Sequence, residues 1–184
     1  MNRKFKNTIK SAVAFVFFIF IAYGSKDTDS SNKDKSSSNT ESNINTDSKS
    51  TQIGEPLSTK YFDVTINSVG IEELVNTGNQ FADLPKEDGI HYLIINVTFK
   101  NTDDESRMLT DGEVLINYNG KEYKYDRSEM IALKGWGLML DQINPLTSRT
   151  TNLVYKIPAE IVGKAYYRPG RASKNDLIEL GEIN

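Results

Sequence analysis

Residues 114–125 read Val-Leu-Ile-Asn-Tyr-Asn-Gly-Lys-Glu-Tyr-Lys-Tyr and predict a β-hairpin. The dipeptide Asn119-Gly120 suits a two-residue type I′ turn, because both central residues of that turn need a positive φ. Such a turn places the larger apolar side chains of both strands on one face. The paired residues are then Tyr118 and Lys121, Ile116 and Tyr123, and Val114 and Tyr125.

The same period-two alternation recurs on both sides of the hairpin and predicts further strands. β-branched and aromatic residues are enriched in each run, and turn residues separate the runs. We expect strands over 62–67, 92–99, 152–157, 165–168 and 177–180, with Pro158 ending the third and Pro169-Gly170 forming a turn. The one candidate helix is 128–133, with Ser128 as its N-cap. Many short strands with almost no helix predict an all-β antiparallel sandwich.

The order of these motifs resembles a family of secreted bacterial immunoglobulin-like domains of unknown function, whose name misleadingly mentions a telomeric repeat-binding factor. The turn Pro145-Leu146 departs from the Pro-Gly of that family. The resemblance covers residues 53–184 and implies an immunoglobulin-like β-sandwich outside the cell, related to a mycobacterial secreted antigen, with no catalytic residues to carry over. The motifs that carry it are Ile53-Gly54-Glu55, FDVTINSV (62–69), YLIINVTFKN (92–101), NGKEY (119–123) and Asn144-Pro145-Leu146 leading into NLVYKIP (152–158).

Residues 1–24 predict an export segment. Four cations lie within the first ten residues, and an unbroken apolar run follows from Ala12 to Tyr23. Such a run spans roughly 18–21 Å as a helix, against about 30 Å of bilayer hydrocarbon, which is typical of a signal peptide. Cleavage is expected between Gly24 and Ser25. Two alternatives stay open: residues 11–24 remain as a short membrane anchor, or Ser25 replaces the Cys of a lipoprotein signal, in which case no lipid thioether can form.

Residues 25–52 predict a disordered linker. Ser, Asn, Asp and Lys dominate the segment, and Ile44 is its single aliphatic residue. It cannot bury enough apolar surface to offset its chain entropy. We expect a spacer that holds the 53–184 domain away from a surface.

Charge and composition exclude several classes of function. Residues 53–184 contain 14 Lys and Arg against 20 Asp and Glu, a net charge of −6, which disfavours nucleic acid as a partner. The chain has no Cys and one His, His91, so the usual His/Cys zinc sites and thiol nucleophiles are absent. We expect His91 to be a structural residue at a strand edge, and we expect no cofactor and no resident metal.

Three other groups of residues could contact a ligand: the acidic turn at 101–105, a set of tyrosines and the segment around Trp136. Oxygen ligands follow the 92–99 strand at 101–105, although their spacing lacks the calcium-loop pattern and favours a solvated turn. Six tyrosines could form a stacking surface, or could be ordinary half-buried sheet residues. They are Tyr118, Tyr123, Tyr125, Tyr155, Tyr166 and Tyr167.

The most informative segment is Gly135-Trp136-Gly137, where two glycines flank the only Trp. The Trp could be a core residue, with Leu138 and Leu140 following it inward, or an exposed binding anchor. We take Gly135, Trp136 and Gly137 as possible ligand contacts. The predicted function is therefore an exported, non-catalytic binding module for an extracellular protein or glycan; the alternative is an envelope-associated enzyme or enzyme inhibitor.

Overall fold

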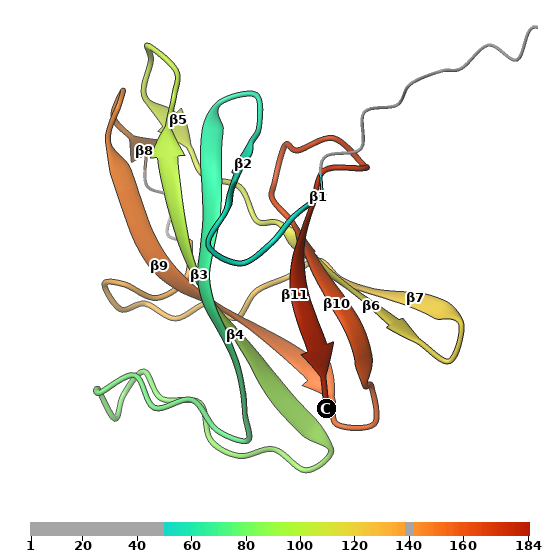
Figure 1. Ribbon diagram of the computed structural model, residues 1–184. Coiled ribbons are helices and arrows are strands. Elements are labelled where there is room, and N and C mark those ends of the chain that lie inside the picture. The colour runs from blue at the N-terminus through green and yellow to red at the C-terminus, as the bar shows by residue number, and fades with distance from the viewer. Residues whose placement is uncertain (1–49, 139–141) are drawn as a thin grey trace, which may run out of the picture. The chain divides into compact units, whose positions relative to one another are not determined.

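The computed structural model describes residues 50–138 and 142–184, and every regular element within these ranges is a β-strand (Figure 1). One sheet has the order β2-β3-β4-β9 and the other β1-β11-β10-β6-β7. The first contains β2 (Pro56–Ser58), β3 (Phe62–Glu72), β4 (Ile90–Asn101) and β9 (Ser148–Pro158). The second contains β1 (Ser50–Thr51), β11 (Leu177–Ile183), β10 (Gly163–Arg168), β6 (Glu113–Tyr118) and β7 (Lys121–Tyr125). A small third sheet pairs β5 (Arg107–Met108) with β8 (Gln142–Ile143).

The two large sheets enclose one hydrophobic core, so the predicted sandwich is confirmed. Inward side chains from both sheets belong to a single buried cluster, as the alternation along each strand predicts. The cluster includes Val64, Ile66, Leu93, Ile95, Val97 and Leu153 from one sheet and Val114, Ile116, Ala165, Tyr167 and Ile178 from the other.

Strand β4 is the centre of its sheet, with β3 and β9 antiparallel on either side of it. Its inward face carries the predicted Leu93, Ile95 and Val97, all fully buried. Its outward face is also covered at one end, because Tyr92 belongs to a second buried cluster with Val154 of β9. The alternation marked Tyr92 as outward and did not reveal that it is buried.

The predicted hairpin is confirmed in register and in turn conformation. Strands β6 and β7 pair Tyr118 with Lys121, and the expected pairs continue away from the turn. Asn119 and Gly120 have φ of 50° and 73°, as a type I′ turn requires. Leu115, which alternation places on the outer face, is buried as well.

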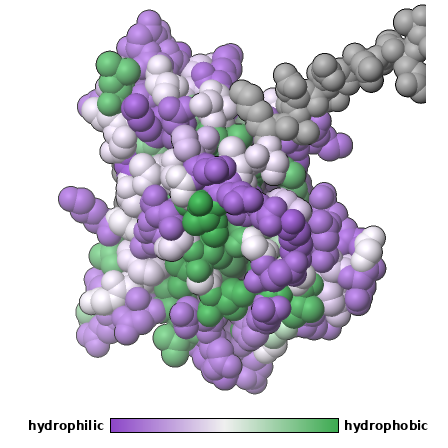
Figure 2. Space-filling model, viewed as in Figure 1, coloured by the Kyte–Doolittle hydropathy of each residue, from purple (hydrophilic) through white to green (hydrophobic). Residues whose placement is uncertain are grey.

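The second half of β3 lies at a sheet edge, because β2 pairs only with Asp63, Val64 and Thr65. Val69 and Ile71 of this half are only partly buried against the core. Figure 2 shows apolar surface gathered in the middle of this face, surrounded by hydrophilic residues. The sandwich therefore does not cover its core completely on this side.

The strand order can be compared with that of an immunoglobulin constant domain. There, consecutive strands A and B pair in one sheet with E beside B, and C, F and G form the other sheet. Here β3 and β4 are consecutive and paired, with β9 beside β4, and β6, β10 and β11 are neighbours in that order in the other sheet. The extra strand β7 pairs with β6 at the edge of the second sheet.

The helix predicted over 128–133 is wrong. The segment is irregular, and the Glu129 N–H donates to the Val154 carbonyl of β9 at 2.7 Å rather than to a carbonyl of its own turn. Ile131 is buried in the second cluster. Pairing with a neighbouring strand and burial of one apolar side chain outweigh the weak helical signal of six residues.

The linker prediction also ends too late. Ser50 and Thr51, assigned to the linker, form β1 and pair in parallel with Leu177 and Ile178 of β11. The predicted export segment 1–24, residues 25–49 of the linker, and Leu140 lie outside the described residues. Within the described part of the chain, no helix has the length and apolar character needed to cross a membrane.

The departure at Pro145-Leu146 has a conformational cost. Thr147 donates to the Asn144 carbonyl at 3.2 Å, and Leu146 has φ of 58° at the third position of this turn. A type II turn requires a positive φ there and normally places Gly in it. Leu146 is 75% exposed, so no core contact explains its presence.

Candidate functional site

The segment Gly135-Trp136-Gly137 is hydrogen-bonded along the free edge of β9. Asn152 of β9 donates its N–H to the Gly135 carbonyl at 2.9 Å, and Gly137 donates to the Asn152 carbonyl at 2.7 Å. The Thr151 hydroxyl donates to the Gly137 carbonyl at 2.8 Å, in a fully buried position. The segment thus satisfies polar groups that an exposed edge strand would leave open.

Both glycines are needed for their backbone conformation. Gly135 has φ of 87° and Gly137 has φ of 67°, values that residues with a Cβ adopt only at a cost. An added Cβ at Gly137 would make only ordinary contacts, the nearest at 3.5 Å. Gly137 is therefore required for its backbone angle and not for lack of space. This backbone conformation helps to orient the adjacent Trp136 side chain.

Trp136 and Leu138 point to opposite sides of the β9 edge. Trp136 is half-buried against the second cluster, which contains Tyr92 and Val154, whereas Leu138 packs against the main core. Trp136 is therefore neither a fully buried core residue nor a freely exposed anchor, the two alternatives that the sequence left open. One portion of its side chain is fixed by packing, and the rest faces solvent.

Three exposed apolar residues lie next in the chain to residues of the second cluster, against which Trp136 packs, and we call them together with Trp136 the outer apolar patch. Phe81 is 90% exposed and Met130 is 97% exposed, while their chain neighbours Ala82 and Ile131 pack in the second cluster. Leu74, beside the buried Val75, is half-exposed. The patch consists of Leu74, Phe81, Met130 and Trp136. Contiguous exposed apolar groups mark an interaction site more often than scattered ones, and the two connections that carry these residues both pack against the second cluster.

A ladder of asparagines connects this loop to the far side of the sheet. Asn67 of β3 donates to the Asn96 side chain at 2.8 Å, and Asn96 donates to Asn152 at 2.7 Å. Asn152 in turn donates its side-chain amide to the Gly135 carbonyl at 3.1 Å. The polar half of the outer sheet face therefore positions the backbone that carries Trp136.

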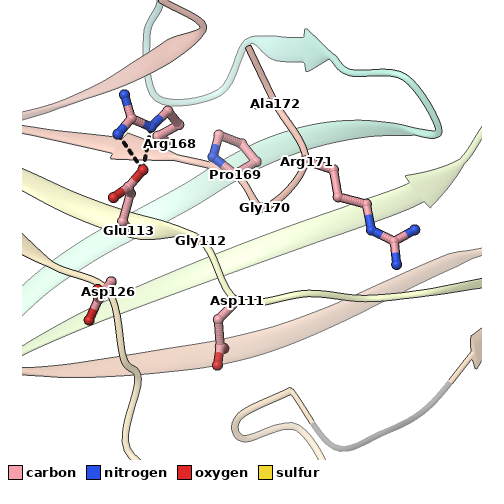
Figure 3. Close-up of a pocket in the computed structure, with 9 residues that line it drawn as sticks. All are labelled: Asp111, Gly112, Glu113, Asp126, Arg168, Pro169, Gly170, Arg171 and Ala172. Carbon is pink, nitrogen blue, oxygen red and sulfur yellow. Dashed lines mark hydrogen bonds and ion pairs between the residues drawn. The ribbon is translucent and has the colours of Figure 1, made fainter. Parts of the chain in front are cut away.

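A second feature is a pocket of about 200 Å³ between the start of β6 and the end of β10. Figure 3 shows Arg168 paired with Glu113 at one side of it and the Arg171 side chain pointing away from that pair. Asp111 and Asp126 also line the pocket. Lys124 also contacts Glu113, at 3.2 Å. Asp111 accepts a hydrogen bond from the Ser128 hydroxyl at 3.1 Å, and Lys124 lies 3.6 Å from Asp126. Each carboxylate that lines the pocket therefore already has a partner.

Two glycines make the pocket possible, and sequence reasoning missed both. A Cβ on Gly112 would lie 2.5 Å from the Arg168 carbonyl oxygen, and one on Gly170 would lie 2.5 Å from the Asp111 carbonyl oxygen. The hydroxyl of buried Tyr155 donates to the Gly112 carbonyl at 3.3 Å, and burial raises its pKa well above the ordinary value. Only the residue type at these two positions could have signalled this close approach.

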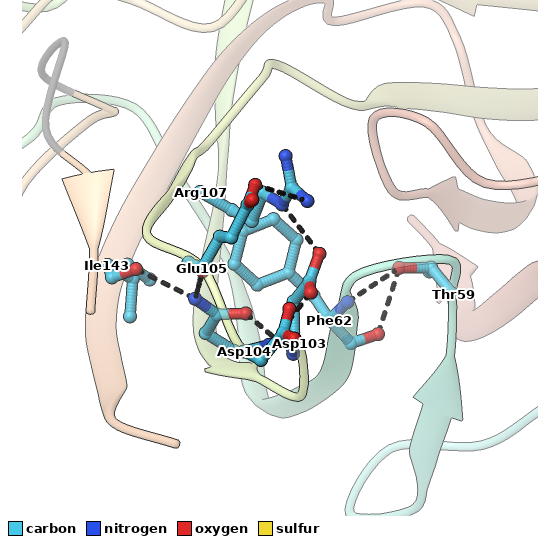
Figure 4. Close-up of polar contacts among 8 residues, drawn as sticks. Thr59, Phe62, Asp103, Asp104, Glu105, Arg107 and Ile143 are labelled. Carbon is cyan, nitrogen blue, oxygen red and sulfur yellow. Dashed lines mark hydrogen bonds and ion pairs between the residues drawn. The ribbon is translucent and has the colours of Figure 1, made fainter. Parts of the chain in front are cut away.

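The acidic turn at 101–105 is a hydrogen-bonded structural turn (Figure 4). The buried Asn101 side chain donates to the carbonyls of Glu105 and Ile143, both at 2.8 Å. Asp103 and Glu105 pair with Arg107 at 2.6 and 2.9 Å. The hydrogen bond from Arg107 lowers the pKa of Asp103 to about 2. Asp103 and Glu105 are therefore engaged in ion pairs with Arg107. Among residues 50–138 and 142–184, no group of three His, Cys, Asp or Glu side chains is placed to hold a metal ion.

The remaining candidates do not share one surface. Tyr155 and Tyr167 are fully buried, whereas Tyr118, Tyr123 and Tyr125 are partly buried against the core. The hypothesis of a single stacking surface made by all six tyrosines is therefore wrong. His91 lies at the start of β4, opposite Ile157 of β9.

Residues 51–175 match the family model of a domain of unknown function, DUF4352. The chain belongs to the DUF4352 family. A search of curated proteins finds no significant match for the chain.

Several solved structures of bacterial proteins are similar to this DUF4352 protein. An uncharacterized β-sandwich protein from Clostridium difficile 630 is 18% identical, with a TM-score of 0.51 over 71% of this chain and 91% of that one. The yjhA protein from Bacillus subtilis is 25% identical, with a TM-score of 0.48 over 71% and 98%. A conserved hypothetical protein from Bacillus anthracis is 20% identical, with a TM-score of 0.48 over 73% and 95%. The first of these agrees with the β-sandwich fold.

Replacing Thr151 by Val should loosen the Trp136 segment of this DUF4352 domain. The substitution keeps the shape of the side chain but leaves the buried Gly137 carbonyl without its hydroxyl donor, at a cost of about 1–2 kcal/mol in the free energy of unfolding. Urea denaturation would measure it, and faster exchange of the Gly137 amide would locate it. The control is Thr150→Val, an exposed neighbour bonded to Thr98, which should change stability by less than about 0.5 kcal/mol. Equal effects from both variants would contradict this role for Thr151.

Proposed function

We propose that this protein is an exported, non-catalytic binding module that acts at the cell surface or outside the cell. Residues 1–24 direct export, and the polar residues 25–49 space the β-sandwich from the surface. The basic start and the apolar run that follows it support this, because they have the pattern of a signal peptide. The resemblance to secreted bacterial domains supports it as well.

The sandwich is proposed to be immunoglobulin-like, and the neighbour orders β3-β4-β9 and β6-β10-β11, which match strands A-B-E and C-F-G, support this. Domains of this architecture hold binding residues on loops over a rigid pair of sheets. The segments 73–89 and 126–138 supply such residues here. Both cover the outer face of the β4 and β9 pair through the second buried cluster, so their exposed side chains rest on the most extensively paired part of the sheet.

The observation that carries the proposal is the outer apolar patch. Trp136 is held by backbone hydrogen bonds on both sides and by packing on one face. A residue fixed in this way loses little freedom on binding, so more of its contact energy contributes to affinity. Trp is also among the residues most often found at the energetic centre of an interface. The partner we propose is an extracellular protein or glycan that covers Trp136, Phe81 and Met130.

Export predicts a new N-terminus. Mass spectrometry of protein recovered from the medium or the envelope should find a chain that begins at Ser25, because the small residues Ala22 and Gly24 precede that bond. Replacing Gly24 by Leu should slow cleavage and leave the chain in the membrane fraction. An intact Met1 chain in the membrane of the unmodified protein would instead indicate the anchor alternative. An intact chain in the soluble intracellular fraction would contradict export.

The patch predicts where a partner binds. Affinity capture from envelope extracts with the full-length protein should recover a partner that is lost with the double variant Phe81→Ser, Met130→Ser. Both residues are at least 90% exposed, so the core is unaffected. The matched control is Leu146→Ser, another exposed apolar residue, which should retain the partner.

Three outcomes of this experiment are informative. Loss of the partner with the double variant alone supports the outer apolar patch as the contact surface. Equal capture by all three proteins would contradict it. Turnover of substrates in a hydrolase panel by the unmodified protein would favour the enzyme alternative over a binding module.

A further inference from the structure

Three cationic side chains surround the ring of Tyr61. The Lys60 ammonium lies 4.8 Å from the ring centroid, and the guanidinium carbons of Arg107 and Arg171 lie 4.4 and 5.8 Å from it. The three charges thus share a region about the size of one Debye length, roughly 10 Å in 0.1 M salt. Cations gathered so closely repel one another unless anions accompany them.

These side chains come from three different connections of the fold. Lys60 and Tyr61 lie between β2 and β3, Arg107 begins β5 after the turn at 101–105, and Arg171 lies between β10 and β11. Figure 1 shows these three connections at the same end of the sandwich. The chain order gives no sign of this convergence, because the positions are far apart in sequence.

The three cations are compensated unequally. Arg107 is paired with Asp103 and Glu105. Within the described residues, neither Lys60 nor Arg171 has a carboxylate at ion-pair distance. The net charge of −6 over residues 53–184 makes two uncompensated cations beside one ring a local exception to an acidic surface.

Arg171 also has a strained backbone. Ala172 donates to the Pro169 carbonyl at 3.1 Å, and in this turn Arg171 has φ of 66°. The third position of such a turn normally requires Gly. The glycine of this turn, Gly170, lies one residue earlier, where the Asp111 backbone approaches too closely for a residue with a Cβ. A positive φ is unfavourable for a residue with a Cβ, and such strained residues concentrate at functional sites.

We propose that Lys60, Tyr61 and Arg171 form a binding site for a phosphate group. Lys60 and Arg171 supply the positive charge, and the Tyr61 hydroxyl donates a hydrogen bond to the phosphate. Arg107 positions the Tyr61 ring by stacking on it. Asp103 and Glu105 in turn hold the guanidinium of Arg107 in place. Lys60, chiefly through a hydrogen bond to the hydroxyl, lowers the pKa of Tyr61. This site is separate from the outer apolar patch and does not depend on it.

The donor set favours phosphate over carboxylate. An ammonium, a phenol and a guanidinium on two separate connections approach a ligand from different directions. A phosphate presents tetrahedrally arranged oxygens that accept from several directions, whereas the two oxygens of a carboxylate lie in one plane. Arginine is well suited to phosphate because its guanidinium can donate two parallel hydrogen bonds.

Titration of the full-length protein with inorganic phosphate, followed by NMR at constant ionic strength, tests the proposal. The amide signals of Lys60, Tyr61 and Arg171 should shift and saturate with a Kd in the millimolar range, about 1 mM corresponding to a modest free energy of binding. The double variant Lys60→Ser, Arg171→Ser should weaken binding at least tenfold. The charge-matched control is Arg127→Ser, Lys134→Ser, which removes two exposed cations from another segment and should leave the Kd unchanged.

A second titration with the soluble diester glycerophosphoglycerol distinguishes the source of the phosphate. Saturable binding of the diester would assign the site to a phosphodiester such as a lipid headgroup, and binding of inorganic phosphate alone would assign it to the free ion. Either result supports the proposal. Shifts that never saturate, or equal weakening in both double variants, would overturn it by showing only general attraction of anions.

Discussion

The antiparallel pairing of β4 with β3 and β9 is the constraint on which the rest of the molecule depends. β4 pairs along nearly its whole length on both sides. Its inward side chains therefore form the centre of the core, and its outward side chains form the surface on which the connecting segments pack. At Tyr92 and Val154 the outward face is apolar and must be covered. The segments 73–89 and 126–138 do so, and this need explains why neither is a simple solvent loop.

The edge of β9 is the second constraint, and it links fold to function. An open strand edge exposes unpaired N–H and C=O groups, and residues 135–137 satisfy part of that edge. The same hydrogen bonds fix the backbone on either side of Trp136. Protection of the sheet and presentation of a half-buried Trp are therefore consequences of one arrangement, and the Asn67, Asn96 and Asn152 ladder extends its support across the sheet.

Most of the fold could be predicted from local patterns. The 114–125 hairpin is determined by Asn119-Gly120 and by its own alternation, so turn type, register and buried face were all available from twelve residues. The middle parts of the long strands were found because one face is apolar there, whereas β3, β4 and β9 extend beyond the predicted 62–67, 92–99 and 152–157. The 128–133 helix was predicted wrongly, since Glu129 pairs with β9, a partner that no local pattern specifies.

The sites were less predictable, because each depends on contacts between distant segments. Trp136 was singled out by its two glycines, but its half-buried state depends on β9 and on the second cluster. The cations around Tyr61 come from three connections of the fold. The turn at Pro169-Gly170 was predicted, but the pattern did not show that Gly170 is required for close packing or that Arg171 adopts a positive φ. None of these tertiary contacts can be read from the spacing of residues in the sequence.

Hydrogen exchange followed by NMR under native conditions tests the central role of β4 most directly. Amides near the middle of β4, such as Ile95 and Val97, should exchange only through global unfolding and should be the slowest in the domain. The Gly137 amide should show intermediate protection, because its partner is the β9 edge. If the β4 amides exchanged as fast as those of the short strands β5 and β8, β4 could not be the strand that organises this sandwich.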